Sequence, residues 1–321
     1  MALGASAVAA LTTFAQAQPR RRVIGWLADR DPADDPVYLR YLDAFKAGMR
    51  ELGYFDGRDY RVEARYAKDD LSRLPALAAD LVKLKVDLII ATPTVSALAA
   101  RKATRDIPIV ITTAGDPVGS GLAASLPHPG GNVTGLTSIS AELYAKRLDF
   151  LHQILPGMVR VGFLYNTANP IDELGLKQFE SACDKLNLKS VRALARNGDE
   201  IVPAFQMLSS EKAQGLVVTS SSMLSLRRKI IEQAAKTRLP TIYARSVFAE
   251  SGGLIAYGPD YPDLFRRAAA YADKIFKGGK PGDLPIEQPN TYELMINLKT
   301  AKALGLKIPD VILLRADKVI E

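Results

Sequence analysis

Hydroxyl and amide side chains recur where the sequence predicts that buried strands end and helices begin. These residues are Thr92, Thr94, Ser96, Asn166, Asn169, Thr219, Ser220 and Ser221. Together with the backbone N–H groups of a helix N-terminus, such side chains can bind a carboxylate without a full positive charge. We therefore predict that they bind a ligand. The alternative for each hydroxyl is a helix cap, and for the two asparagines it is turn formation.

Further candidates flank the same predicted strand ends. Trp26 and Ala28 close the first predicted strand, where Trp26 forms either a pocket wall or part of the packing of one lobe. Asp116 suits the ammonium group of a ligand, although an aspartate before proline also begins ordinary turns. Tyr243 and Tyr257 are placed to contact an apolar part of the ligand, with a core or hinge position as the alternative.

The chain offers little for metal binding or nucleophilic catalysis. It contains two histidines, His128 and His152, and one cysteine, Cys183, which makes a zinc site improbable. Cys183 falls in an amphipathic helical pattern that indicates a buried structural thiol. The glycine-rich stretch 129–135 lacks the spacing and the lysine of a phosphate-binding loop. We expect no catalytic residue, no metal and no cofactor.

Apolar strands and amphipathic helices alternate along the chain, which predicts parallel sheets with helices on both faces. Strands are expected over 22–27, 60–66, 86–91, 107–112, 160–165, 189–194, 215–219, 240–243, 252–258 and 293–297, and helices over 37–53, 71–85, 141–155, 172–186, 200–211, 223–237 and 261–277. The alternation pauses over the Gly- and Pro-rich stretch 114–135 and then restarts. The expected fold class is α/β, with two doubly wound parallel-sheet lobes.

Short glycine-bearing segments near 135–140, 250–255 and 283–290 are expected to pass between the lobes. A hinge of three segments would let the lobes close, because a few residues at element ends can absorb such a motion. The expected first lobe comprises 22–137 plus 253–284, and the expected second lobe comprises 138–252 plus 285–321.

The first 17 residues are apolar and uncharged, and they end in Ala15-Gln16-Ala17. This pattern is typical of the apolar and cleavage regions of a secretory signal peptide. The segment is shorter than the roughly 20 apolar residues that span a bilayer. It contains no cysteine to carry a lipid anchor, so we expect a periplasmic protein without one.

The net charge of +7 follows from 42 Lys and Arg against 35 Asp and Glu, and the isoelectric point is near 9.3. Basic surfaces attract anions, but these charges are scattered along the chain. The single dense run, Arg20 to Arg22, directly follows the predicted leader. We interpret it as a solvated arm, and we expect no nucleic-acid partner.

Several short motifs occur together in a fixed order. They are 24–27 (IGWL), 51–57 (ELGYFDG), 107–111 (IPIVI), 116–122 (DPVGSGL), 129–135 (PGGNVTG), 252–258 (GGLIAYG), 284–289 (LPIEQP) and 296–305 (INLKTAKALG). The set resembles the bacterial ABC-transporter substrate-binding protein family that includes tryptophan/tyrosine-type binding proteins, over about 22–321. The resemblance implies the type I periplasmic-binding-protein fold with three crossovers. It also implies delivery of a small solute to a membrane permease and its ATPase, and we expect a monomer.

The leading functional hypothesis is therefore a solute-binding protein whose lobes close around a small organic ligand such as an amino acid or an aromatic carboxylate. One alternative is a sensory binding domain that presents its ligand-bound form to a membrane receptor. Another is an enzyme with a catalytic cleft on the same architecture. Scarce histidine and one predicted buried cysteine count against most versions of the enzyme.

Overall fold

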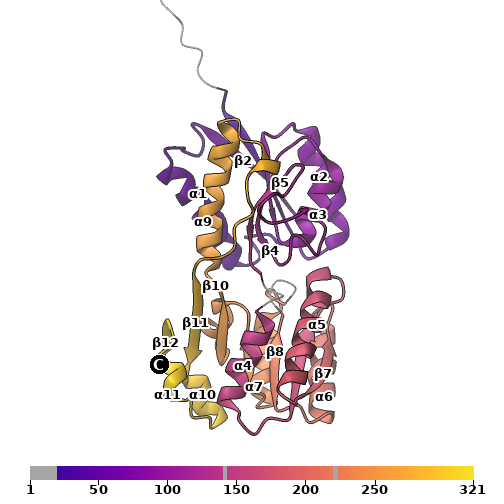
Figure 1. The fold of residues 1–321 in the computed structure, drawn as a ribbon, viewed down its shortest axis with the longest axis vertical. Helices are drawn as coiled ribbons and strands as arrows, with labels where there is room; N and C mark the ends of the chain where they lie inside the picture. The colour runs from indigo at the N-terminus through magenta and orange to yellow at the C-terminus, as the bar shows by residue number, and fades with distance from the viewer. Residues whose placement is uncertain (1–19, 140–142, 220–222) are drawn as a thin grey trace, which may run out of the picture.

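The computed structural model describes residues 20–139, 143–219 and 223–321. The predicted leader and the candidates Ser220 and Ser221 lie outside these residues. The chain forms two α/β lobes stacked along the long axis of the molecule (Figure 1). The predicted fold class is confirmed, because each lobe is built on a parallel or mostly parallel sheet flanked by helices.

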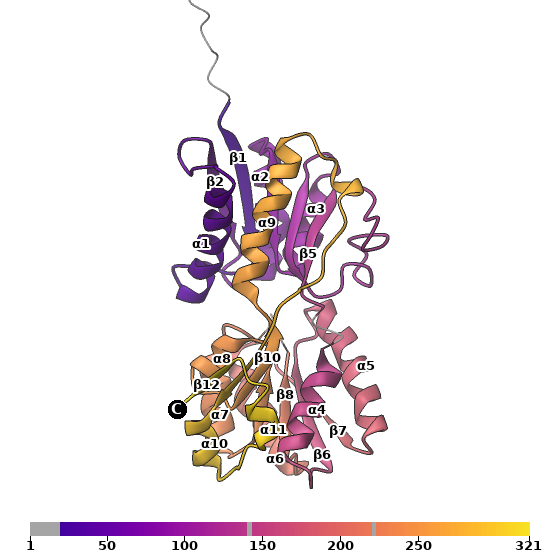
Figure 2. The ribbon, with the colours of Figure 1, turned by 60° about the vertical axis from the view of Figure 1, so that its left-hand side comes forward.

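The first lobe contains a five-stranded sheet in the order β2-β1-β3-β4-β5, and all its described pairings are parallel. Its strands are β1 (Arg22–Ala28), β2 (Tyr60–Tyr66), β3 (Leu88–Thr92), β4 (Ile109–Ala114) and β5 (Val133–Thr137). Its helices are α1 (Pro36–Glu51), α2 (Leu74–Lys83), α3 (Thr94–Ala103) and α9 (Tyr261–Phe276), with short 3₁₀ turns at Leu71–Arg73 and Pro281–Asp283. Helices α1 and α9 lie side by side, as Figures 1 and 2 both show.

Alternating side chains of β1 divide the core of this lobe between the two faces of the sheet, as the period of a strand requires. Ile24 and Trp26 pack toward α1 and α9, whereas Val23 and Leu27 pack toward α2 and α3. The Trp26 ring lies 5.7 Å from the ring of Phe45 on α1, centroid to centroid. Helix α9 therefore completes a core that the N-terminal segment begins.

The second lobe contains a seven-stranded sheet in the order β12-β11-β10-β9-β8-β6-β7. Its strands are β6 (Arg160–Tyr165), β7 (Lys189–Leu194), β8 (Gly215–Val218), β9 (Thr241–Tyr243), β10 (Ile255–Pro259), β11 (Tyr292–Asn297) and β12 (Lys318–Ile320). Its helices are α4 (Tyr144–Ile154), α5 (Pro170–Lys185), α6 (Ile201–Ser210), α7 (Arg227–Lys236), α8 (Ser246–Glu250), α10 (Leu298–Leu304) and α11 (Asp310–Leu313), with a 3₁₀ turn at Gly198–Glu200.

Strands β10 and β11 pair antiparallel, unlike their neighbours in this sheet. The reason is the path of the chain, which leaves the second lobe through β10 and returns to it through β11 after forming α9 (Figure 2). The segment 253–259, which the sequence assigned to the first lobe, therefore lies in the second. That expected boundary is wrong, because β10 pairs with β9 and β11, and the passage between lobes follows Pro259.

No helix within the described parts of the chain is both long enough and apolar enough to cross a membrane.

Candidate ligand-binding cleft between the lobes

A cavity of about 400 Å³ lies between the two lobes and is lined by residues of both. The first lobe contributes Asp29, Arg30, Asp69, Asp70, Leu71, Pro93 and Val95. The second lobe contributes Asn166, Ala168, Asn169, Arg196, Asn197, Gly198, Ser225 and Leu226. The cavity sits beyond the carboxyl ends of strands in both sheets, where ligands bind in open α/β sheets.

The first-lobe wall carries a charged group that continues directly from β1. Asp29 and Arg30 are buried, and Arg30 Nε lies 3.4 Å from Asp29 Oδ2. The other end of the guanidinium pairs with Asp69. Arg30 Nε and Nη1 make no well-aligned hydrogen bond to any described residue. Both nitrogens are buried beside carboxylates, Asp29 for Nε and Asp69 for Nη1, so the guanidinium balances the negative charge of this wall.

The carboxyl group of Asp29 lies in an apolar setting between two cations. Burial raises the pKa of Asp29, and the guanidinium groups of Arg30 and Arg245 oppose part of this rise. A buried carboxylate of this kind gains from a further cation nearby. A ligand ammonium group at this wall would supply one.

Beside the cavity, an arginine of the second lobe reaches aromatic side chains of helices α1 and α9. Arg245, which follows β9, donates from Nη1 to the Tyr41 hydroxyl oxygen at 3.1 Å. Its guanidinium carbon lies 3.7 Å from the centroid of the Tyr261 ring, a close cation–π contact. Arg245 is buried and only 5% exposed.

Two ion pairs also join the lobes among the described residues. Arg227 at the start of α7 pairs through both terminal nitrogens with Asp35, which precedes α1, and the two side chains are 8% and 13% exposed. Arg40 Nη1 on α1 lies 3.2 Å from Glu250 Oε2 on α8, and the Arg40 side chain is 63% exposed. The lobes are therefore in contact next to the cavity.

Helices α3 and α5 begin at the cleft, one from each lobe. No side chain caps α3, whose start follows Pro93, whereas the Asn169 side chain caps α5 by accepting from the backbone N–H of Ile171 at 3.3 Å. Uncapped N–H groups at a helix start favour anions. The start of α3 is thus the better candidate for a ligand carboxylate.

Three predicted residues of the second lobe lie at or behind this cleft. Asn166 and Asn169 line the cavity. Asn169 Nδ2 donates to Asp172 Oδ1 at 2.9 Å, and Thr219 Oγ1 donates to Asp172 Oδ2 at 2.9 Å. Thr219 is fully buried, so it supports the cavity wall from behind and does not line it.

The predicted hydroxyl residues of the first lobe lie at the junction of β3 and α3. Thr92 Oγ1 lies 3.0 Å from Thr113 Oγ1, and Thr92 borders a small void that also touches Asp29 and Arg245. Thr94 Oγ1 accepts from the backbone N–H of Gly115 at 3.1 Å, which ties β4 to α3 and does not cap α3. Ser96 is fully buried, and its Oγ has no hydrogen-bond partner among the described residues.

Other sequence candidates lie away from the cavity. Trp26 and Ala28 are buried in the first-lobe core, because their side chains point from β1 toward α1 and α9. Asp116 Oδ1 accepts from the backbone N–H of Gly119 at 2.8 Å, so Asp116 closes a turn.

The two tyrosine candidates pack inside the second lobe. The Tyr243 ring stacks on Phe248 at 4.6 Å between centroids, and Tyr243 is 1% exposed. Tyr257 packs between Phe150 and Tyr292, at 5.0 and 6.1 Å between ring centroids. Like Trp26, Ala28 and Asp116, neither tyrosine lines the cavity, because both rings pack against other aromatic side chains of the second lobe.

Several cavity residues were missed by the sequence analysis. Asp29 and Arg30 directly follow β1, so the same strand-end pattern that selected Asn166 could have found them. Arg196 similarly follows β7. Asp69 carries no such signal, since it lies in a loop after β2 with a positive φ of 65°.

The described residues bring together no group of three or more His, Cys, Asp or Glu side chains that could hold a metal ion.

Two α/β lobes with a cavity between them define the class of two-lobed solute-binding proteins. Residues 32–320 match the model of the family described as ABC transporter substrate binding protein, and the chain belongs to that family. The resemblance inferred from the motifs is thereby confirmed. Substrate-binding proteins of this family are extracytoplasmic and are not a class of enzymes.

Individual relatives extend the comparison. The chain is 30% identical to the tyrosine-binding protein of Clostridioides difficile (strain R20291) over 271 residues. The aligned region covers 83% of this chain and 78% of that protein. The ABC domain from Streptococcus pneumonia in complex with L-Trp is 24% identical, with a TM-score of 0.85 over 94% of this chain and 100% of that one. The ligand-free, open structure of CD0873 from Clostridium difficile, a substrate binding protein with adhesive properties, is 26% identical, with a TM-score of 0.68 over 94% and 99%.

Proposed function

We propose that this protein is the extracytoplasmic solute-binding component of an ABC importer. Its two lobes close around a small organic ligand and present the closed form to a membrane permease. The observation that carries the proposal is the cavity of about 400 Å³ whose walls come from both lobes. A ligand that contacts both walls stabilises the closed state relative to the open state, which shifts the population between them.

We further propose that the ligand is an amino acid, preferably an aromatic one, or an aromatic carboxylate. The cavity volume lies near the lower end of the roughly 300–1,000 Å³ common for small-molecule sites. Asp29 suits an ammonium group, and the start of α3 suits a carboxylate. Leu71 and Leu226 supply apolar walls on opposite lobes. The names of the two relatives that bind tyrosine and L-Trp support the same ligand class.

A closed arrangement of the lobes fits this proposal. The cross-lobe contacts of Arg227 and Arg245 bring the second lobe against α1. The chain is also more similar in shape to the L-Trp complex than to the ligand-free, open relative.

The proposed location is the periplasm, with residues 1–17 acting as a signal peptide that is removed on export. This part of the proposal is supported by the sequence pattern and by the extracytoplasmic character of the family. A monomer is the form that we propose meets the permease.

Isothermal titration of the protein purified from the periplasm tests the binding proposal. L-tyrosine, L-tryptophan, L-leucine and phenylacetate are the probes. The variant Ala168→Trp places an indole in the cavity from an exposed position, and Ala76→Trp, on an exposed site of α2 outside the lining, is the matched control. We expect at least one amino acid to bind wild type and Ala76→Trp, and to lose binding in Ala168→Trp.

Equal binding of an amino acid by wild type and Ala168→Trp would refute the site, and no binding of any probe would refute the ligand class. Uptake of the bound probe by cells that carry wild type or Ala168→Trp tests the transport step. Equal uptake by both strains would refute a role in import.

A further inference from the structure

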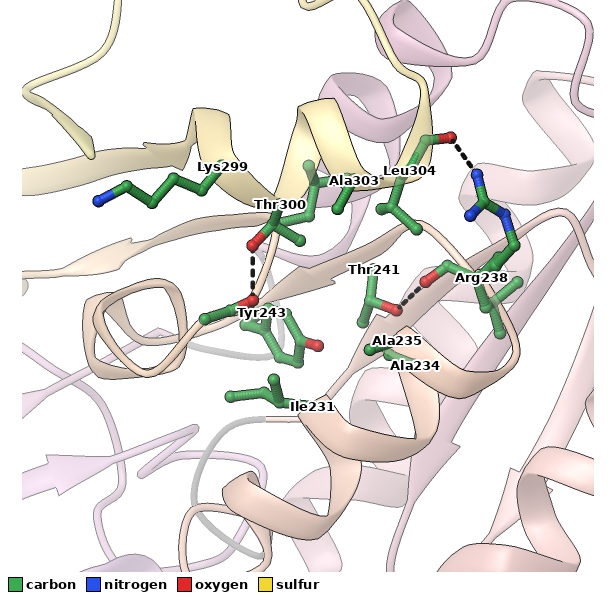
Figure 3. A pocket seen from close by; sticks show the side chains of 14 residues that line it. Ile231, Ala234, Ala235, Arg238, Thr241, Tyr243, Lys299, Thr300, Ala303 and Leu304 are labelled. Atoms are coloured by element: carbon green, nitrogen blue, oxygen red, sulfur yellow. Dashed lines mark hydrogen bonds between the residues drawn. The ribbon is translucent and has the colours of Figure 1, made fainter. Parts of the chain in front are cut away.

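A second cavity, of about 240 Å³, lies wholly within the second lobe (Figure 3). It is bordered by α7, β9, the loop that leads into β10, and α10. It shares no lining residue with the cleft between the lobes. We propose that this cavity is a second binding site, for a small molecule that combines an apolar ring or branched body with one anionic group.

The walls of this lobe-2 pocket are mainly apolar. Ile231 and Leu239 contribute from the α7 side, and Leu304 contributes from α10. Ala235 and Ala303, whose small side chains point into the pocket in Figure 3, leave the space between the two helices open. An apolar body placed there would gain free energy from burial, in proportion to the area removed from water.

Two cations stand at opposite sides of the pocket, and no carboxylate appears among the described residues that line it (Figure 3). Arg238 Nη2 donates to the backbone oxygen of Leu304 at 3.3 Å, which holds its guanidinium beside α10. Lys299 is exposed at the start of the same helix. The positive potential of this pair favours an anionic group on the ligand.

The buried floor of the pocket carries no charge on its described residues. Tyr243 is stacked on Phe248, and burial raises the pKa of Tyr243, so its phenol stays neutral and does not repel an anion. Thr241 Oγ1 donates to the backbone oxygen of Leu239 at 2.9 Å, and Thr300 Oγ1 donates to that of Gly252 at 2.8 Å. Because these hydroxyl protons are already engaged, polarity at the floor is low, and the cations at the rim are the charged groups nearest to a bound ligand.

The volume selects the size of the ligand. An apolar cavity of roughly 150 Å³ holds one benzene molecule. The lobe-2 pocket is larger than that and has room for one ring and a short acidic group. Phenylacetate matches this description, and its amide, phenylacetamide, is a neutral molecule of nearly the same shape.

This site is independent of the proposed transport function, because all its walls belong to one lobe. Its occupancy therefore does not require closure of the lobes. A test must still separate it from the cleft, which also suits aromatic carboxylates.

Ligand-detected NMR and isothermal titration with phenylacetate separate the two sites when applied to variants of the full protein. Ala168→Trp fills the cleft, whereas Ala303→Leu fills the lobe-2 pocket from an exposed position on α10. Ala76→Leu is the matched control for the second change. We expect Ala168→Trp and Ala168→Trp/Ala76→Leu each to bind one equivalent of phenylacetate that Ala168→Trp/Ala303→Leu does not bind.

Comparing phenylacetate with its neutral amide tests whether the pocket prefers an anionic ligand. In the Ala168→Trp background, Lys299→Gln should weaken phenylacetate binding about twofold to fivefold, as expected for an exposed charge pair, and leave phenylacetamide unchanged. Absence of phenylacetate binding in Ala168→Trp, or equal binding after Ala303→Leu is added, would overturn the proposal. An equal loss for acid and amide with Lys299→Gln would overturn the assignment of an anionic ligand. None of these outcomes depends on whether the cleft binds an amino acid.

Discussion

The ion pair between Asp35 and Arg227 is expected to hold the lobes together, and removing one charge should open them. Asp35→Asn is the informative change. Asp35 also caps α1 by accepting from the backbone N–H of Val37 at 3.1 Å, and asparagine is as good a cap as aspartate. The variant therefore removes the charge and keeps the helix start. Arg227→Gln removes the other partner without touching the cap.

The expected magnitude follows from the burial of the pair. The two side chains are only 8% and 13% exposed. We therefore expect the pair to stabilise the closed state by about 1.5–3 kcal/mol, the contribution typical of a hydrogen bond to a charged group. That free energy corresponds to a decrease of about 10-fold to 150-fold in the ratio of closed to open protein. Opening returns the remaining charge to water, so the loss appears as opening and not as unfolding. The Kd of a ligand that requires the closed state rises by up to the same factor.

Small-angle X-ray scattering of the ligand-free protein measures the opening directly. Asp35→Asn and Arg227→Gln should each increase the radius of gyration while the Tm changes little. Arg40→Gln breaks the pair with Glu250, in which the Arg40 side chain is 63% exposed, and serves as the control. Exposed pairs contribute about 0–1 kcal/mol, so this control should leave the scattering profile close to that of wild type.

Scattering profiles of Asp35→Asn and Arg227→Gln that match wild type would refute the reasoning. So would additive effects in the double variant, because two residues that act through one contact must show coupling.

The remaining predictions concern single side chains. Burial raises the pKa of Asp29, so the folded state keeps a proton that the unfolded chain has lost, and stability decreases as pH rises from the ordinary aspartate pKa through the raised one. Asp29→Asn should therefore raise the Tm at pH 7 but not below about pH 4. A gain of equal size at both pH values would contradict this. Burial raises the pKa of Cys183 to about 12, so a thiol reagent at pH 8 should label the unfolded chain and spare the folded one; rapid labelling of folded protein would exclude a buried thiol. A Cβ at Gly48 would lie 2.2 Å from the backbone oxygen of Arg266. Gly48→Ala should therefore lower the free energy of unfolding in urea by about 1–3 kcal/mol, despite the better helix propensity of alanine. Gly157→Ala, where a Cβ meets nothing within 4 Å, is the control, and equal stability of the two variants would disprove the tight packing.

The sequence was sufficient to predict the alternating elements and the edge of each sheet that faces the cleft. Asn166 and Asn169 were placed correctly beside the cavity, because the carboxyl ends of parallel strands meet at one edge. That rule gives the edge of a sheet but not the face to which a side chain points. Trp26 was therefore a candidate for a pocket wall as well as for lobe packing, and only the packing of α9 against β1 decides that it is core.

The charged wall of the cleft was harder to predict for a different reason. The pairing of Arg30 with Asp69 joins two loops that are distant in sequence, and no local pattern encodes it. The same limit explains the boundary error at Gly253. Its glycines indicate a turn, but the turn connects α8 with β10 inside one lobe, and the sequence does not state which sheet receives the following strand.

The late position of α9 in the chain has a consequence for biosynthesis. Phe265 on this helix stacks on Trp26 at 5.8 Å and on Tyr41 at 4.7 Å, so the core of the first lobe stays incomplete until α9 has been made. A nascent chain that ends before Tyr261 leaves the apolar faces of β1 and α1 exposed to water. The N-terminal half is thus kept from a finished fold while the ribosome completes the rest, a delay that would suit the export that we propose.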